Sequence, residues 1–460
     1  MLAALDDFGR RSGFRRAVAA LGLIGICAGA APPAHALSFI RDAEIEQYLR
    51  EWEMPVWTAA GLDPESMHIF LINSNEINSF VAAGQNIFIY TGLLLRADSA
   101  NQVVGVMAHE TGHIAGGHLA RMSDAMEKAT IPAIVGLVLG AATAVATGNG
   151  DALRAGMSAG ESIAERTFLS FSRTQERSAD QAAATFLDST GQSARGLLQF
   201  MQKLQQQEYL TGAHMDRYLL THPLTQERVD FLERVVASSK YPTIVETPAR
   251  KEEFARMLGK LVGFLAPTAL VFQRFKETDT SIGALYAHAV AYHRMGQEDG
   301  AQKIVDRLIA GKPNDPFFNE LKGQFLFEDG KVPAAVPYYR TANRLLPHNS
   351  LLETEMAQSM IETGDHRYDD EALAVLKDAS GRDDENALTW RLLATIEGRR
   401  GDMPQATLDL AEEFYAEGRL REAKGEAQKA QKMLPNGSPG YLRAQDIESA
   451  ADQAMKDARR

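Results

Sequence analysis

The sequence predicts a mostly helical α+β domain with a small β-sheet, followed by an all-α solenoid of tandem repeats. Residues 99–118 combine helix capping with helically spaced apolar residues, and residues 67–91 alternate short apolar runs with Asn and Gly turns. Glycine, alanine and proline recur at 34-residue intervals between residues 296 and 347. With 460 residues, of which 45% are hydrophobic, the chain can form two or three globular domains.

Residues 1–36 have the features of a secretory signal peptide. An apolar stretch, Ala17–Ala31, follows a basic region and precedes the A-x-A cleavage site Ala34-His35-Ala36. The basic region contains Arg10, Arg11, Arg15 and Arg16. Because the apolar stretch is too short to span a bilayer, we expect cleavage and export to the bacterial periplasm.

The mature chain is expected to be acidic and free of cysteine. Cys27 is the only cysteine, and cleavage after Ala36 would remove it, so no disulfide would contribute to stability. The whole chain has a net charge of −12, and loss of the four arginines and two aspartates of residues 1–36 leaves −14. This charge argues against binding to nucleic acid or to anionic lipid, and it leaves open a peripheral contact with the outer membrane.

Helices are predicted over residues 40–57 and 99–118, on either side of the short strands. Ser99 and Gln102 have the spacing of a capping box at the start of the second helix. The body of that helix is largely apolar and therefore predicted to be buried; its apolar residues are Val103, Val104, Val106, Met107 and Ile114.

The second helix carries the motif HExxH, formed by His109-Glu110-Thr111-Gly112-His113. Histidines at i and i+4 project from one helical face, so both imidazoles can bind one zinc ion. Glu110 lies one position along the helix and can take a proton from a zinc-bound water. The alternative interpretation is an amphipathic core helix whose histidines only form hydrogen bonds.

A catalytic zinc site needs a third protein ligand. A histidine six residues after His113 would complete a metzincin pattern, but Leu119 stands there and the nearby His118 comes one residue early. Glu176 is the preferred third ligand, and Glu161 and Glu165 are the alternatives.

Glu176 lies on a further predicted helix, which begins at a second capping box, Ser172–Gln175, and runs to about Gly191. Asp180 follows one turn later, where it can accept the spare N–H of a zinc-bound histidine and fix its tautomer. Such a carboxylate pair also occurs on ordinary solvated helix faces, so the preceding HExxH motif carries the assignment.

These motifs together resemble the HExxH peptidase family that includes the heat-shock membrane protease HtpX and the CAAX prenyl proteases. The HExxH motif followed by Glu176–Asp180 is similar to the family's HExxH…ExxxD core, and the resemblance covers about residues 38–235. Asn78-Ser79-Phe80 leading to Gln85–Gly92 resembles the family's hairpin, with Ser79 where the family usually has alanine. His222–Arg228 is similar to its HPxxxxR segment.

The resemblance implies a zincin-like metallopeptidase domain with one zinc ion per chain. It implies zinc ligation by His109, His113 and Glu176, with Glu110 as general base and Asp180 as a supporting carboxylate. It also implies roles for His222 and Arg228. His222 would either stabilise the oxyanion of the tetrahedral intermediate or occupy the fourth position on zinc and keep the enzyme latent. The structural alternative makes His222 only a helix-entry residue before Pro223.

Two segments near this site have alternative interpretations. In zinc peptidases the strand before the metal helix often lines the cleft, so residues 87–91 could pair with an extended substrate. The same stretch could simply form a core hairpin, and the two interpretations are compatible. Residues 131–147 are apolar and rich in Gly and Ala. We favour a hydrophobic hairpin acting as a lid, a substrate contact or an interfacial segment, over a buried helix or a membrane span.

Beyond a linker at residues 238–248, the pattern becomes helical and repetitive. Gly296 and Gly330, Ala301 and Ala335, and Pro313 and Pro347 are each 34 residues apart, which is the tetratricopeptide period. Such helix pairs stack and leave a concave groove for peptides or partner subunits, although the repeats could also only stabilise the first domain.

The predicted domain division is a signal peptide (1–36), a zinc metallopeptidase domain (37–237), a linker and connecting helix (238–280), tetratricopeptide repeats (281–436) and a C-terminal capping helix (437–460).

An exported member of this family with C-terminal repeats looks like the periplasmic BepA branch. The resemblance implies a zinc endopeptidase in the quality control and assembly of outer-membrane proteins. Its implied partners are unfolded or misassembled outer-membrane proteins and, through the repeats, the β-barrel assembly machinery. The rival interpretation is a repeat-based chaperone or scaffold whose zinc site is latent. A membrane-embedded prenyl-type protease is disfavoured because long apolar spans are lacking.

Overall fold

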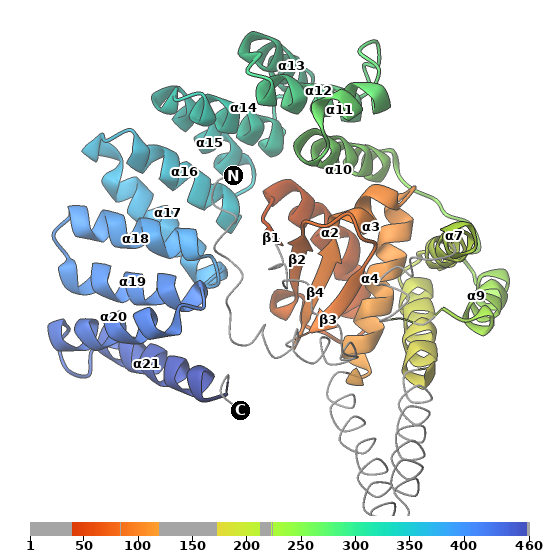
Figure 1. Ribbon diagram of the computed structural model, residues 1–460, viewed down its shortest axis with the longest axis horizontal. Coiled ribbons are helices and arrows are strands. Elements are labelled where there is room, and N and C mark those ends of the chain that lie inside the picture. The colour runs from red at the N-terminus through yellow and green to blue at the C-terminus, as the bar shows by residue number, and fades with distance from the viewer. Residues whose placement is uncertain (1–38, 83, 119–172, 212–221, 223, 458–460) are drawn as a thin grey trace, which may run out of the picture. The chain divides into compact units, whose positions relative to one another are not determined.

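A computed structural model describes residues 39–82, 84–118, 173–211, 222 and 224–457 (Figure 1). The predictions for residues 1–36 and 131–147, and the rival ligands Glu161 and Glu165, lie outside the described residues. The chain divides into two compact units: Leu49–Lys251, and Met1–Tyr48 together with Glu252–Arg460.

A small mixed β-sheet lies at the centre of the first unit. Its strands β2 (His68–Ile72), β4 (Asn86–Tyr90) and β3 (Ser79–Ala82) are neighbours in that order. β4 runs parallel to β2 and antiparallel to β3. Stacked phenylalanine rings across these pairs, Phe70 with Phe88 and Phe80 with Phe88, reinforce the register.

The suggestion that residues 87–91 pair with a substrate backbone is therefore wrong. β4 already forms hydrogen-bonded ladders on both sides, and Thr91 begins the next helix. Among the described residues, β3 has no second neighbouring strand, so the edge available in this part of the sheet is β3.

The helix that carries HExxH is α4 (Ala100–Ala115), and it begins as the sequence predicts. The hydroxyl of Ser99 accepts a hydrogen bond from the backbone N–H of Gln102, and the Gln102 side chain accepts one from the backbone N–H of Asp98. Every residue of α4 from Ala100 to His113 is buried. Among its described residues, this unit also contains α3 (Thr91–Arg96), a helix over residues 173–189, α7 (Arg195–Thr211) and α9 (Gln226–Ser238).

Two glycines on α4 allow neighbouring helices to approach its backbone. A Cβ atom on Gly105 would lie 2.5 Å from the backbone nitrogen of Leu197 in α7. A Cβ atom on Gly112 would lie 2.8 Å from the carbonyl oxygen of Ala179, in the helix over residues 173–189. Because glycine has no side chain, α7 and the helix that contains Ala179 can pack directly against the backbone of α4.

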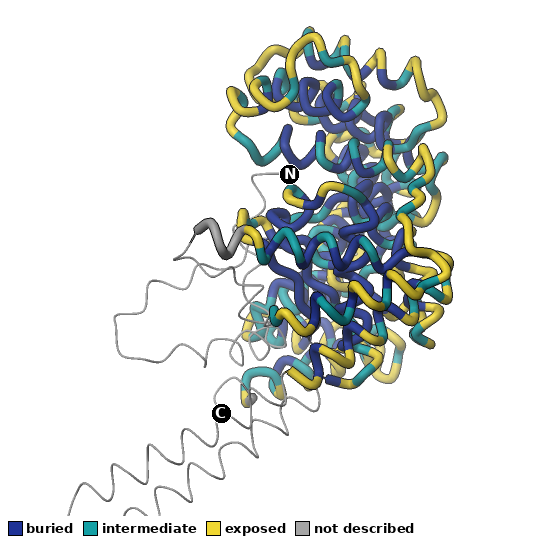
Figure 2. The backbone as a smooth tube through the Cα atoms, turned by 90° about the vertical axis from the view of Figure 1, so that its right-hand side faces the viewer, coloured by how far each residue is buried: buried dark blue, intermediate teal, exposed yellow. Residues whose placement is uncertain are grey.

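The second unit is a series of packed helix pairs, which confirms the predicted all-α solenoid. Gly296 and Gly330 have φ angles of +70° and +75°, and each stands in the turn between the two helices of a pair. Figure 2 shows buried and exposed residues along the backbone, and helices such as α13 (Glu298–Gly311) and α20 (Leu420–Met433) carry both.

The helices of the second unit are α10 (Pro248–Leu265), α11 (Thr268–Arg274), α12 (Ile282–Arg294), α13 (Glu298–Gly311), α14 (Pro316–Glu328), α15 (Val332–Leu345), α16 (Ser350–Glu362), α17 (Asp369–Arg382), α18 (Ala387–Arg399), α19 (Met403–Ala416), α20 (Leu420–Met433) and α21 (Pro439–Asp457). Near the start of the described residues, β1 (Phe39–Ile40) and α2 (Ala43–Ala59) precede β2 in the sequence. None of the described helices is long and apolar enough to cross a membrane.

The close packing of α4 predicts that Gly105→Ala destabilises the protein. The added methyl group would force α7 away from α4, and overpacking of this kind costs about 1–3 kcal/mol. Thermal unfolding measures the effect. Gly425→Ala is the matched control, because its methyl group meets nothing within 4 Å and should stabilise α20 by about 0.5–1 kcal/mol. Equal stability of the two variants would contradict the close contact.

Candidate metal centre

His109 and His113 lie one turn apart on α4, and both side chains are buried. Their Nε2 atoms are 3.2 Å apart, so the two imidazoles point toward one point in space. This is the arrangement that the HExxH spacing predicts.

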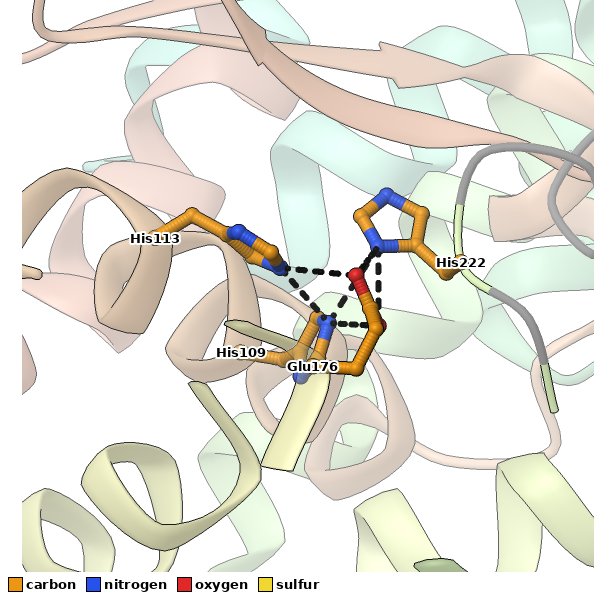
Figure 3. Close-up of side chains that lie close together, drawn as sticks. All are labelled: His109, His113, Glu176 and His222. Carbon is orange, nitrogen blue, oxygen red and sulfur yellow. Dashed lines mark hydrogen bonds and ion pairs between the residues drawn. The ribbon is translucent and has the colours of Figure 1, made fainter. Parts of the chain in front are cut away.

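Glu176 reaches both imidazoles from the helix over residues 173–189 (Figure 3). Its Oε2 atom lies 3.3 Å from Nε2 of His109, and its Oε1 atom lies 3.4 Å from Nε2 of His113. The close approach of Ala179 to Gly112 fixes the separation of the two helices and so permits this reach. The structure thus brings all three predicted metal ligands together.

His222 adds a fourth donor to this group (Figure 3). Its Nδ1 atom lies 3.3 Å from Nε2 of His109 and 3.2 Å from Oε1 of Glu176. Its Nε2 atom lies 3.2 Å from the backbone carbonyl oxygen of Ser79, at the start of β3. When Nε2 donates a proton to that carbonyl, the lone pair of Nδ1 faces the other donors.

The four groups fit a zinc ion. Three imidazole nitrogens and one carboxylate are ligands that zinc prefers in proteins. Neighbouring donors are 3.2–3.4 Å apart. Zinc bonds of about 2.0–2.1 Å would separate the corners of a tetrahedron by about 3.3 Å, which matches these distances. Buried donors that face one another without a proton or a cation between them are unfavourable, so the arrangement itself favours a bound cation.

Asp180 and Arg228 support the group from behind. Oδ1 of Asp180 lies 2.9 Å from Nδ1 of His109. Arg228 donates to both oxygens of Asp180, from Nε at 2.7 Å and from Nη2 at 2.8 Å, and its Nη1 atom lies 2.8 Å from Glu176. Asp180 therefore lies where a carboxylate can hold the tautomer and ring orientation of His109.

The groups around the site favour the ionised forms of Asp180 and Glu176. Burial alone would raise the pKa of Asp180, but the hydrogen bonds and positive charge of Arg228 outweigh burial and lower it. Burial would also raise the pKa of Glu176, whereas the neighbouring His222 and the positive charge of Arg228 hold it well below its usual range.

Glu110 lies beside the donors and not among them. Its side chain is fully buried, and neither carboxylate oxygen has a hydrogen-bond partner within the part of the chain that the structure describes. Nε2 of His222 lies 3.6 Å from Oε1. Burial raises the pKa of Glu110, which brings a general base closer to the pH at which it works.

Two contacts of the site were not predicted from the sequence. The sequence makes Arg228 a candidate site residue but does not indicate its partner, because Asp180 lies 48 residues earlier in the chain. The sequence gives His118 no role beyond its mismatch with the metzincin spacing, yet its Nδ1 atom lies 3.1 Å from Nδ1 of His113. The glycine pair Gly116-Gly117 before it is the only local signal of a turn there.

Comparison with known proteins identifies the family of this domain. Residues 41–236 match the family described as Peptidase family M48. Beta-barrel assembly-enhancing protease of Escherichia coli K12 is 26% identical over 393 residues, which cover 84% of this chain and 78% of that protein. Its counterpart from Yersinia pestis is 25% identical over 399 residues, covering 84% and 79%. Metalloprotease YcaL of Escherichia coli K12 is 28% identical over 168 residues, covering 36% and 61%.

The match covers residues 41–236, so the part of the chain that contains all four converging side chains is an M48 peptidase domain.

Proposed function

We propose that this chain is a periplasmic zinc endopeptidase that acts on outer-membrane proteins. The observation that carries the proposal is the convergence of His109, His113, Glu176 and His222, with the buried carboxylate of Glu110 beside them. Zinc bound there would supply Lewis-acid activation of water and of the scissile carbonyl.

In the proposed mechanism, His109, His113 and Glu176 hold the metal, and the chain's other residues handle protons and geometry. Glu110 takes a proton from the attacking water and returns it to the leaving amine. Asp180 fixes the orientation of His109, and Arg228 holds Asp180 and Glu176 in place through buried, charge-assisted hydrogen bonds.

We propose that His222 keeps the enzyme latent by filling the fourth ligand position. Its Nδ1 atom is directed at the other donors, so it competes with water for that position. Its Nε2 atom engages the Ser79 carbonyl of β3, the available sheet edge on which an extended substrate would add a strand. Displacement of His222 would thus free the fourth position and this part of the sheet edge together.

The proposed clients follow from strand addition and from the relatives. Unfolded or misassembled outer-membrane β-barrels expose extended segments that suit an edge strand, and the relatives named above are beta-barrel assembly-enhancing proteases. The repeats would bind the client or the β-barrel assembly machinery. In this proposal, residues 1–36 direct export, residues 37–237 form the peptidase domain, residues 238–280 connect, and residues 281–460 form the repeats and their cap.

The second candidate function is a chaperone or scaffold with a latent zinc site. The position of His222 favours it, because four protein donors resemble a closed structural site. The presence of Glu110 favours the enzyme, because a structural site needs no base at that position.

We predict that Glu110→Gln lowers the rate of client cleavage by about 10²–10⁴-fold, because the amide cannot accept the water proton. The measurement is cleavage of an unfolded outer-membrane β-barrel protein by the zinc-loaded enzyme. Glu227→Gln is the control, since it makes the same chemical change at an exposed side chain and should leave the rate unchanged. If the wild type cleaves nothing while both proteins support client maturation, the scaffold function replaces the enzyme.

We predict that chelation abolishes cleavage and that added zinc restores it. Zinc should also stabilise the folded protein, by about 2.7 kcal/mol at a free concentration 100 times its Kd. Calorimetry with increasing zinc measures this rise in stability. The His109→Ala variant should show a much smaller rise, and an equal rise in both proteins would contradict the ligand assignment.

We predict that His222→Ala increases basal cleavage, because the fourth ligand position becomes open to water. Initial rates of cleavage at saturating zinc provide the measurement. A loss of activity with unchanged zinc affinity would instead assign His222 to stabilising the oxyanion.

A further inference from the structure

His118 is buried directly after the end of α4. The helix ends at Ala115, and Gly117 has a φ angle of +61°, which favours glycine and turns the chain back. As a result, His118 does not continue away from the site but is almost fully buried, with 3% of its surface exposed.

The imidazole of His118 contacts the far side of the metal-ligand candidate His113. The two Nδ1 atoms are 3.1 Å apart, and the rings meet nearly at right angles, at 82°. Nε2 of His113 faces His109 and Glu176. When the Nε2 lone pair is used for the metal, the ring proton of neutral His113 is on Nδ1. That proton then points to Nδ1 of His118, which must act as the acceptor.

Two neighbours hold His118 in this position. A Cβ atom at residue 116 would lie 2.5 Å from Nε2 of His118, so only glycine leaves room for the ring there. The side chain of Gln175 donates a hydrogen bond to the backbone carbonyl of His118 at 3.2 Å. Gln175 directly precedes Glu176, so His118 is connected to the segments that supply His113 and Glu176.

We propose that His118 is a positioning residue for His113, as Asp180 is for His109. It accepts the Nδ1 proton of His113, fixes the tautomer and holds the ring toward the metal. The two metal-binding histidines of α4 would then have different supports: a carboxylate paired with an arginine behind His109, and a neutral imidazole behind His113. This inference rests on the metal site of the proposed function.

Three substitutions of His118 distinguish its role as a hydrogen-bond acceptor from the effect of its ring on packing. The side-chain oxygen of asparagine can stand where Nδ1 of histidine stands, whereas that of glutamine stands nearer to Nε2. His118→Ala and His118→Gln should weaken zinc binding by about 10–100-fold, the usual effect of losing such a partner. His118→Asn should bind zinc nearly as tightly as the wild type.

The measurement is the zinc Kd of the full chain, obtained by competition with a chromophoric chelator, together with kcat and KM for a client. His288→Ala is the control, because His288 is also buried but bonds the carbonyl of Phe275 in the other unit. It should leave the zinc Kd unchanged. Unfolding temperatures in excess chelator test whether the substitutions disturb packing without metal.

The proposal is supported if, of the three variants, only His118→Asn keeps a zinc affinity close to that of the wild type, with similar unfolding temperatures in chelator. Unchanged zinc affinity in all three variants overturns it. Equal loss in all three also overturns it, because His118 would then act through packing. If the wild type itself binds no zinc, the proposed function fails. If the wild type binds zinc and the alanine variant binds equally well, only the role of His118 fails.

Discussion

The site depends on the close contact between α4 and the helix over residues 173–189. Gly112 stands inside the HExxH motif, and its missing side chain lets the backbone at Ala179 approach. This approach is what places the Glu176 carboxylate within 3.4 Å of both imidazoles. The Glu176 side chain is too short to compensate for a displacement of its helix by several ångströms. The packing of the two helices therefore determines whether the donor atoms can converge.

Burying so many ionisable groups together requires their charges to be matched. Arg228 contacts two carboxylates, Asp180 and Glu176, and all three side chains are nearly inaccessible to solvent. Removing one member of a buried ion pair usually costs about 3–5 kcal/mol, because the remaining charge is left without a partner. Arg228 therefore contributes to the fold and to the preparation of the site, and a lysine could not reproduce its two-pronged contact with Asp180.

The sequence was most informative where the determining geometry is local. The i and i+4 spacing predicts the pairing of His109 and His113, and the 34-residue period predicts the helix pairs of the solenoid. Neither depends on contacts between distant segments. The order of the strands does, and for this reason the substrate-pairing role suggested for residues 87–91 was wrong: alternating apolar residues do not reveal which strand is central.

The contacts of Arg228 and His118 could not be predicted from the sequence, because they also depend on tertiary or backbone geometry. The spacing of Glu176 and Asp180 shows that both can face α4, but the partner of Arg228 depends on the packing of α9. His118 is only five residues from His113, yet its orientation depends on the left-handed turn at Gly117. A fixed-spacing motif does not contain that backbone conformation.

The imidazole of His222 contacts two parts of the site through its two nitrogens. One nitrogen faces the metal donors, and the other holds a main-chain carbonyl of β3. If a client adds to β3 as proposed, its N–H group would compete with the imidazole for this carbonyl, and client docking and the release of a coordination position would be thermodynamically linked. Such coupling would make proteolysis conditional on extended structure in the client, and folded proteins in the same compartment would be spared without a separate inhibitor.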